Sequence, residues 1–145
     1  MYLLDTNIVS QLDPKRHSHA APLIAWLTRN GASLFLSVMT ITELDAGVLK
    51  LRREGKTKRA NQLATLVADI LTDFGDRVLP VDLGTSRHIA RLGEATQHQP
   101  VALPYLIIAA TAARHGLTVL TRNMSDFGRL NVPAIDPFAT LPPDV

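Results

Sequence analysis

The chain has 145 residues, of which 46% are hydrophobic, and its mean hydropathy is +0.11. These values predict one compact domain over residues 1–145, with room for a substantial core. The chain contains no cysteine, which excludes a disulfide framework and a zinc–thiolate site.

The net charge of +2 and the isoelectric point near 9.3 are only mildly basic, so they do not by themselves indicate a nucleic-acid partner. The sequence shows no signal peptide, no lipidation motif and no apolar stretch of the length that a bilayer requires. We therefore expect a cytoplasmic protein with no membrane partner.

Short apolar runs alternate with helical periods along the chain. The first half is predicted to contain a strand at Tyr2–Leu4, a helix through Ile8, Val9 and Leu12, a helix through Leu23–Leu27, a strand at Leu34–Leu36 and a helix through Ile41–Leu51. The second half is predicted to contain an amphipathic helix through Leu63–Leu71, a strand at Val78–Val81, a helix over Thr85–Gln97, a buried helix over Leu106–Ala113, a strand at Leu117–Leu120 and an edge strand at Val132–Ile135. This alternation predicts an α/β fold, a three-layer α/β/α sandwich with a mostly parallel central sheet.

Asp5 directly follows the first predicted strand, Tyr2–Leu4. In open α/β sheets, ligands bind in the crevice outside the carboxyl ends of the strands, so a functional carboxylate is expected at this position. Aspartate is also a preferred residue for capping a helix, and a helix is expected to begin near Thr6. Capping is sufficient to explain Asp5 alone, and a metal site requires further acids.

Two more acids lie at comparable places. Glu43, in the segment SVMTITELDAG, is near the N-terminal end of its predicted helix, where the helix dipole favours a carboxylate whatever its role. Asp126 lies six residues after Leu120, where capping of a short helical turn is the alternative. Hard divalent cations require several oxygen ligands gathered in one place. We therefore predict a metal site formed by Asp5, Glu43 and Asp126.

The motifs LLDTN at residues 3–7, TELDAG at residues 42–47 and IAATAARHGLTVLTRNMSDF at residues 108–127 occur in this order. Together they resemble PIN-domain ribonucleases of the VapC toxin type, including the FitB-like members, over nearly the whole chain. The resemblance implies the toxin of a type II toxin–antitoxin system, an endoribonuclease that depends on Mg²⁺ or Mn²⁺. It also implies a homodimer, an RNA substrate, a VapB-type antitoxin that occludes the active site, and DNA contact only through that antitoxin.

The resemblance also assigns roles to residues. Asp5, Glu43 and Asp126 match acidic positions of the family, and Thr6 and Asn123 match polar residues beside the metal. In an intact site Asp5 and the residue at position 105 would bind the ion directly, and Glu43 and Asp126 would hold its water molecules. Thr6 and Asn123 would orient these groups by hydrogen bonds.

Tyr105 departs from the family pattern, in which an Asp stands three residues before IAAT. A neutral phenol, with a pKa of about 10, is a poor ligand for magnesium. Three explanations are open: a naturally degenerate toxin, an inactivating substitution, or compensation by a nearby acid. A catalytically inactive PIN module that binds antitoxin or RNA is the alternative function. A small-molecule phosphatase is a third, although Asp5 lacks the second acid of a DxD pair.

The segment Lys50–Arg59 holds six basic residues and is offset only by Glu54. Solvated helix ends, RNA-backbone contact and antitoxin docking are all consistent with this run. None of the five histidines has a convincing catalytic partner, and the pair His17 and His19 is expected to be solvated.

Overall fold

The computed structural model describes the backbone of all 145 residues and the side chains of all except residues 17–19. The expectation for His17 and His19 therefore lies outside the described side chains. The strands are β1 (Tyr2–Leu4), β2 (Leu34–Ser37), β3 (Val78–Leu79), β4 (Thr118–Leu120) and β5 (Ala134–Ile135). They form one sheet in the order β3-β2-β1-β4-β5, and every neighbouring pair is parallel. The predicted sheet was mostly parallel, and the observed one is parallel throughout.

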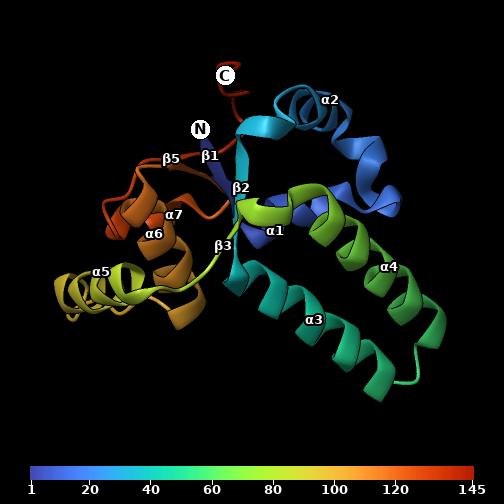
Figure 1. Cartoon of the computed structure of the whole chain (residues 1–145), viewed down its shortest axis with the longest axis horizontal. Helices are drawn as coiled ribbons and strands as arrows, with labels where there is room; N and C mark the ends of the chain where they lie inside the picture. Colours follow the sequence, from blue (N-terminus) through green and yellow to red (C-terminus); the bar gives the residue numbers. More distant parts are fainter.

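Helices cover both faces of this sheet. The α-helices are α1 (Thr6–Val9), α2 (Ala21–Arg29), α3 (Val38–Arg53), α4 (Thr57–Phe74), α5 (Leu83–Ala95), α6 (Leu103–His115) and α7 (Met124–Arg129). Figure 1 shows α5 and α6 on one side of the strands and α3 and α4 on the other, which confirms the predicted three-layer arrangement. Within the described part of the chain, no helix is both long and apolar enough to cross a membrane.

The strands supply alternate side chains to two cores, because successive strand residues point to opposite faces. Leu4 of β1 packs in a core with Trp26 of α2 and Val67 of α4. Leu3, its neighbour in the sequence, packs in a second core with Ile108 of α6. All five side chains are at most 5% exposed, so β1 is buried on both faces. The apolar run at the chain start is explained by this position at the centre of the sheet.

Two helices begin directly where strands end, and each has a side-chain cap. Asp5 follows β1 and accepts a hydrogen bond from the backbone N–H of Thr6, the first residue of α1. Ser37 ends β2 and its hydroxyl oxygen accepts from the N–H of Met39 in α3. The capping role predicted for Asp5 is therefore confirmed. Because β1 and β2 are adjacent and parallel, α1 and α3 begin side by side at the carboxyl edge of the sheet.

Several predicted boundaries differ from the observed ones. Strand β3 ends at Leu79 rather than Val81, because Pro80 has no N–H to donate to a neighbouring strand. The helix predicted through Ile8–Leu12 is α1 followed by a separate 3₁₀ turn over Ser10–Leu12. The short helical turn expected at Asp126 is present as α7, but its N-cap is Asn123, and Asp126 lies within the first turn.

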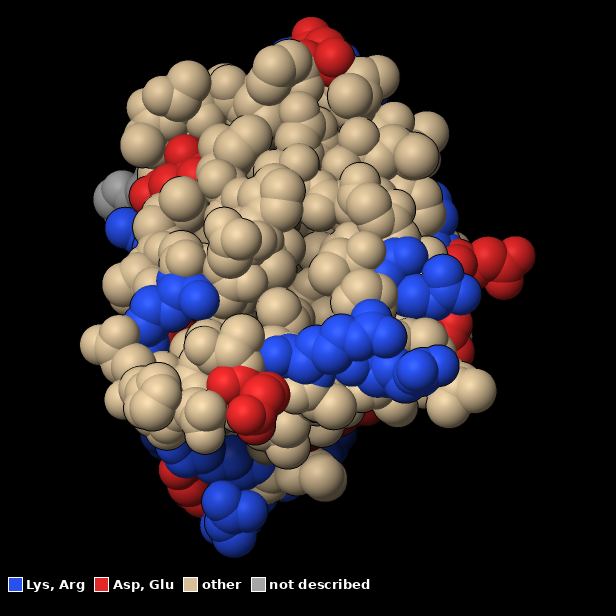
Figure 2. All heavy atoms as spheres, turned by 90° about the vertical axis from the view of Figure 1, so that its left-hand side faces the viewer, with Lys and Arg blue, Asp and Glu red and all other residues tan. Residues whose placement is uncertain are grey.

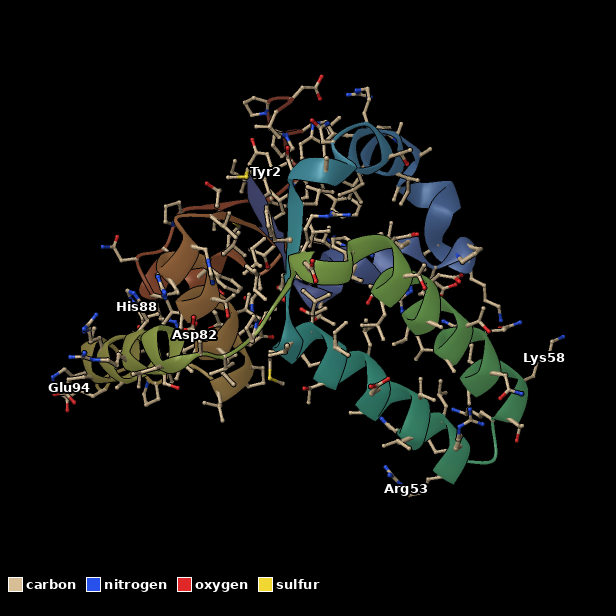
Figure 3. All side chains as sticks on the ribbon, in the orientation of Figure 1. Tyr2, Arg53, Lys58, Asp82, His88 and Glu94 are labelled. Carbon is tan, nitrogen blue, oxygen red and sulfur yellow. The ribbon has the colours of Figure 1, made fainter. Side chains whose placement is uncertain are left out.

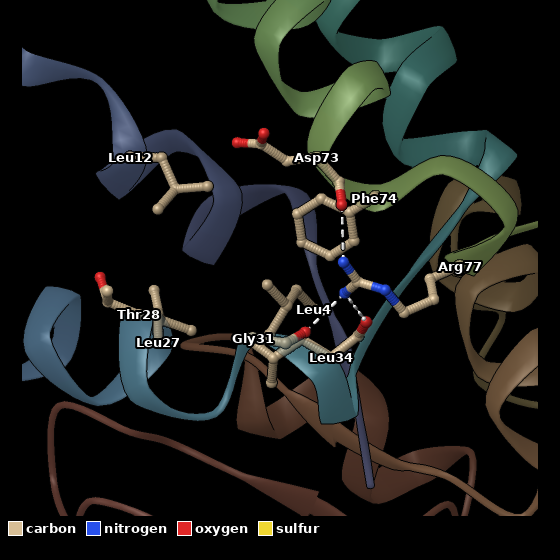
Figure 4. A pocket seen from close by; sticks show the side chains of 9 residues that line it. All are labelled: Leu4, Leu12, Leu27, Thr28, Gly31, Leu34, Asp73, Phe74 and Arg77. Carbon is tan, nitrogen blue, oxygen red and sulfur yellow. Dashed lines mark hydrogen bonds between the residues drawn. The ribbon is translucent and has the colours of Figure 1, made fainter.

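The side chain of Arg77 forms hydrogen bonds with several backbone segments beside an apolar pocket lined by Leu4 and Leu27 (Figure 4). Its guanidinium donates to the backbone carbonyls of Gly31 (2.5 Å), Leu34 (2.8 Å) and Asp73 (2.6 Å). The same group lies 4.8 Å from the centre of the Phe74 ring. One side chain thus joins the start of β2 to the end of α4.

Replacing Arg77 with methionine should lower the free energy of unfolding by about 2–3 kcal/mol, because three carbonyls lose a charged donor. Arg53→Met is the matched control, since Arg53 is an exposed arginine at the end of α3 and should change stability by less than about 0.5 kcal/mol. Urea denaturation followed by Trp26 fluorescence measures both. Equal stability of the two variants would refute this role for Arg77.

Candidate functional site

A cleft of about 340 Å³ opens beside the carboxyl ends of β1 and β4. The residues that line it come from α1 and the turn after it, from α3, from the start of α6 and from the segment after β4. They are Asp5, Thr6, Asn7, Ser10, Gln11, Arg16, Glu43, Tyr105 and Arg122. Parallel strands gather such residues because their carboxyl ends meet at one edge of the sheet.

Asp5 is the most deeply buried acid of this cleft, with 2% of its surface exposed. Its Oδ1 accepts a hydrogen bond from the Thr6 backbone N–H at 2.7 Å. Its Oδ2 accepts from the Thr121 hydroxyl at 2.6 Å and from the Asn7 amide nitrogen at 3.0 Å. Three donors therefore hold the carboxylate in one orientation.

Burial raises the pKa of the Asp5 carboxyl above its usual range. Hydrogen bonds from Thr121 and Thr6 act in the opposite direction, and the negative charge of Glu43 raises the pKa further. The net shift is upward, so the folded protein disfavours the ionised form of Asp5. A cation placed beside Asp5 and Glu43 would relieve both causes of this cost.

This shift predicts a pH-dependent effect of Asp5→Asn on stability. The pKa of the Asp5 carboxyl is higher in the folded protein than its ordinary value of 3.8. Its contribution to stability is therefore complete below pH 3.8 and is lost as the pH rises through the folded pKa. Asparagine does not titrate. The free energy of unfolding of Asp5→Asn, relative to the parent chain, should therefore rise between about pH 3 and pH 7. Urea denaturation at both pH values measures it, and a constant or falling difference would contradict the shift.

Glu43 of α3 is joined to Asp5 through Thr6. The Thr6 hydroxyl donates to Oε1 of Glu43 at 2.7 Å, and it also lies 3.2 Å from the Thr40 hydroxyl. The backbone of Thr6 simultaneously donates to Asp5. Thr6 is thus placed between the two acids, as a residue that orients both of them.

Asp126 is placed differently from the other two predicted acids. It does not line the cleft, and it forms an ion pair with Arg129 within α7. Its Oδ2 accepts from the Asn123 amide at 2.7 Å, and the Asn123 backbone N–H donates to the Thr121 hydroxyl at 2.9 Å. Since Thr121 donates to Asp5, Asp126 is linked to the cleft through a chain of hydrogen bonds.

Tyr105 lies in the cleft together with Asp5 and Glu43. It is the third residue of α6, and its ring packs edge-on against Phe127, with 5.9 Å between the ring centres and an interplanar angle of 78°. An aspartate at this position would bring a third carboxylate to the same cleft. The position that departs from the family pattern is therefore inside the candidate site.

The oxygen atoms of this cleft suit a hard divalent cation. Two carboxylates, Asp5 and Glu43, stand beside the hydroxyl of Thr6. Among the side chains that the structure describes, no three acidic or histidine groups are close enough to share one metal ion. Mg²⁺ keeps several water molecules and is usually held by one or two carboxylates, so these two fit a hydrated ion. A metal role for Asp126 stays a prediction.

Thr121 and Asn7 contact Asp5, although neither was expected in the site from the sequence. Thr121 directly follows β4, the strand paired with β1, and Asn7 occupies the first turn of α1. Their contacts with Asp5 follow from the same rule that singled out Asp5, namely that polar residues at the carboxyl ends of adjacent parallel strands converge. The missing information was the strand order, because only that order makes β4 the neighbour of β1.

The basic segment lies at the free end of the α3–α4 pair. Arg53 and Lys58 point outward there in Figure 3. Several of its charges are partly offset: Lys50 and Lys56 lie 3.9 and 3.1 Å from Glu54, and Arg59 forms an ion pair with Asp13. The solvated helix end is the interpretation that these contacts favour.

The PIN domain family model matches residues 2–132 of the chain. This chain belongs to the PIN domain family. The curated relatives include a VapC ribonuclease, Y4jK of Sinorhizobium fredii, which is 33% identical over 95% of this chain and 98% of its own length. Toxin FitB of Neisseria gonorrhoeae is 34% identical over 95% of this chain and 99% of its own length.

Solved structures of similar chains agree with this assignment. The crystal structure of FitAcB from Neisseria gonorrhoeae matches 95% of this chain and 99% of the solved chain, with a TM-score of 0.82 and 32% identity. A structure of FitAB bound to a DNA fragment matches with a TM-score of 0.74 and 31% identity, over 95% of this chain and 96% of the solved chain. The predicted α/β fold and the resemblance to VapC- and FitB-like PIN proteins are confirmed.

Proposed function

We propose that this PIN-domain chain is the toxin of a toxin–antitoxin pair, and that its cleft is the site of a Mg²⁺- or Mn²⁺-dependent endoribonuclease weakened by Tyr105. The observation that carries the proposal is the meeting of Asp5 and Glu43, joined through Thr6, in a cleft at the carboxyl edge of the sheet. Paired carboxylates that repel each other in a buried site are typical of a cation-binding centre.

The residues of the cleft would have different roles in this reaction. Asp5 and Glu43 would hold the ion, which when bound supplies an activated water and offsets charge on the phosphate oxygens. Thr121 and Asn7 fix the Asp5 carboxylate by donating to its Oδ2, and Thr6 fixes the Glu43 carboxylate. These donors keep both acids in place before any substrate binds, which reduces the reorganisation that the reaction requires.

The second candidate function is a catalytically inactive PIN module that binds antitoxin or RNA. Tyr105 favours it, because its phenol ring takes up space in the cleft where a third carboxylate would supply a ligand and a charge. The two candidates differ in one property, which is whether the chain cleaves RNA at all when a divalent ion is present.

An antitoxin of the VapB type is the proposed protein partner. The solved complexes of related chains include FitAB bound to DNA, which is 31% identical over 95% of this chain, and a toxin–antitoxin complex from Klebsiella pneumoniae at 28% identity. For the present chain we propose the same type of assembly, in which the antitoxin covers the cleft and makes the contacts with DNA.

We also propose that the chain forms a two-fold homodimer. Much of the face that carries α5 and α6 shows neither acidic nor basic side chains in Figure 2. Leu83 and Leu103, at the starts of these two helices, are 79% and 59% exposed. Two exposed leucines on a face with few charged side chains, together with the family resemblance, support association through this face. Light scattering at micromolar concentration should return the mass of a dimer, and a monomer mass would refute the proposal.

RNA degradation tests the proposed activity directly. The purified chain, incubated with a pool of single-stranded and structured RNA, should cleave slowly with Mg²⁺ or Mn²⁺ and stop when a chelator is added. Cleavage that persists in chelator would contradict a metal-dependent reaction. Absence of cleavage under both conditions, also after Tyr105→Asp, would favour the inactive binding module.

A further inference from the structure

Arg122 lines the same cleft as Asp5 and Glu43, although its position in the sequence indicated no role. It follows Thr121, and its backbone N–H donates to the side-chain carbonyl of Asn7 at 3.3 Å. The backbone of Arg122 is therefore attached to the network that holds Asp5. Its side chain is exposed, and it forms no ion pair with any carboxylate among the described residues.

The guanidinium of Arg122 is held in place by an aromatic ring. It lies 4.6 Å from the centre of the Phe138 ring. Stacking of this kind uses the flat face of the guanidinium and leaves the N–H groups at its edge free to donate in the plane. The side chain is thus oriented, with its hydrogen-bonding edge available to a ligand.

Phe138 is itself fixed by the turn that follows β5. The side chain of Asp136 accepts from the Phe138 backbone N–H at 2.9 Å, and its carbonyl accepts from Ala139 and Thr140 at 3.1 Å each. Further along, the chain is attached again where Tyr2 donates to the carbonyl of Pro143 at 3.2 Å. The ring therefore sits on an ordered turn, which lowers the entropic cost of holding Arg122 in one position.

We propose that Arg122, stacked on Phe138, binds a phosphate of the RNA backbone next to the acids of the cleft. A planar guanidinium with a free edge matches two phosphate oxygens, and the resulting bidentate contact is both strong and directional. Such a cation is needed here because Asp5 and Glu43 repel a phosphodiester. Arg16 lines the same cleft from the segment after α1 and adds a second positive charge.

This inference rests on the proposed RNA substrate, but it is tested by binding in chelator, where cleavage does not contribute. The probe is a fluorescent single-stranded oligouridylate, and its dissociation constant is measured by anisotropy over a series of salt concentrations. Four variants are compared with the parent chain: Arg122→Gln, Arg122→Lys, Phe138→Leu and the control Arg87→Gln. Arg87 is an exposed arginine on α5 that lines no part of the cleft.

Arg122→Gln should weaken binding about tenfold and lower the slope of log affinity against log salt by about 0.7, the value of one phosphate contact on a single strand. Phe138→Leu should weaken binding about two- to fivefold with an unchanged slope, because the charge remains while the ring is lost. Arg122→Lys should also keep the slope, and it serves as the folded comparison if Arg122→Gln is unstable. Arg87→Gln should match the parent.

Equal losses for Arg122→Gln and Arg87→Gln would overturn the proposal, because they would show a general effect of net charge. A polyglutamate peptide of matched charge that binds as tightly as RNA, with the same dependence on Arg122, would also overturn it in favour of an acidic protein segment. If RNA binding depends on Arg122 but Tyr105→Asp fails to cleave, the proposed nuclease function fails and the phosphate contact stands.

Discussion

Replacing Tyr105 with aspartate should raise the rate of Mg²⁺- or Mn²⁺-dependent RNA cleavage by about 100-fold or more. The substitution brings a third carboxylate into the cleft that already holds Asp5 and Glu43. It also removes a ring from that space. The additional charge makes the empty cleft less favourable and the cation-bound cleft more favourable, so metal affinity and cleavage should increase together. The measurement is the initial rate of RNA degradation for both chains with the ion and with chelator.

Tyr105→Phe is the control for this prediction, because it keeps the ring and adds no carboxylate. It should show no gain in cleavage. Tyr105→Asp should also lower the free energy of unfolding, because it removes the edge-on contact with Phe127, worth about 0.5–1.5 kcal/mol, together with the area that the ring buries against the second core. Equal, chelator-sensitive activity of the parent chain and Tyr105→Asp would show that residue 105 does not act on the metal site.

Replacing a single acid in the Tyr105→Asp chain should lower the rate of RNA cleavage again. The size of the loss should depend on where that acid lies relative to the cleft. Asp5→Asn should lower the rate by about 100- to 1000-fold, because it removes the charge of the most buried acid while keeping its size. Glu43→Gln should have the next largest effect. Asp126→Asn should lower the cleavage rate only about tenfold, because Asp126 is paired with Arg129 and is connected to the cleft only through a chain of hydrogen bonds.

Single-turnover cleavage rates at saturating Mn²⁺ measure this order. Circular dichroism and urea denaturation of each variant exclude loss of folding as the cause. The Asp5→Asn variant should lose less stability at neutral pH than at pH 3, because burial penalises the charge that asparagine lacks. If Asp126→Asn abolishes cleavage and Asp5→Asn leaves it intact, the assignment of the two cleft acids is wrong.

Much of the fold was predictable because the strong signals in this chain are local. Tyr2–Leu4 is apolar on both faces, as a central parallel strand must be, and β1 is found there. Strand ends were less predictable. Val78–Val81 is apolar enough for a longer strand, but Pro80 cannot donate to a neighbour, and β3 ends at Leu79.

The candidate site was predictable to the extent that it depends on strand ends. Asp5 was placed at the carboxyl end of a buried strand from its position alone, and the cleft is found at that end. Thr121 and Arg122 were not assigned, because their approach to Asp5 depends on β4 pairing with β1. The ion pair of Asp126 with Arg129, which sets Asp126 apart from the cleft, depends on side-chain conformations that no spacing rule specifies.

The most direct test of this account is the location of a bound ion. Crystals of the Tyr105→Asp chain soaked in Mn²⁺ should show an anomalous difference peak in the cleft, within ligand distance of Asp5 and close to Glu43. The same soak of the Asp5→Asn variant should show no peak at this place. A manganese peak elsewhere in the protein, or none in the Tyr105→Asp crystals at high Mn²⁺ concentration, would contradict a metal-dependent nuclease site at the carboxyl edge of this sheet.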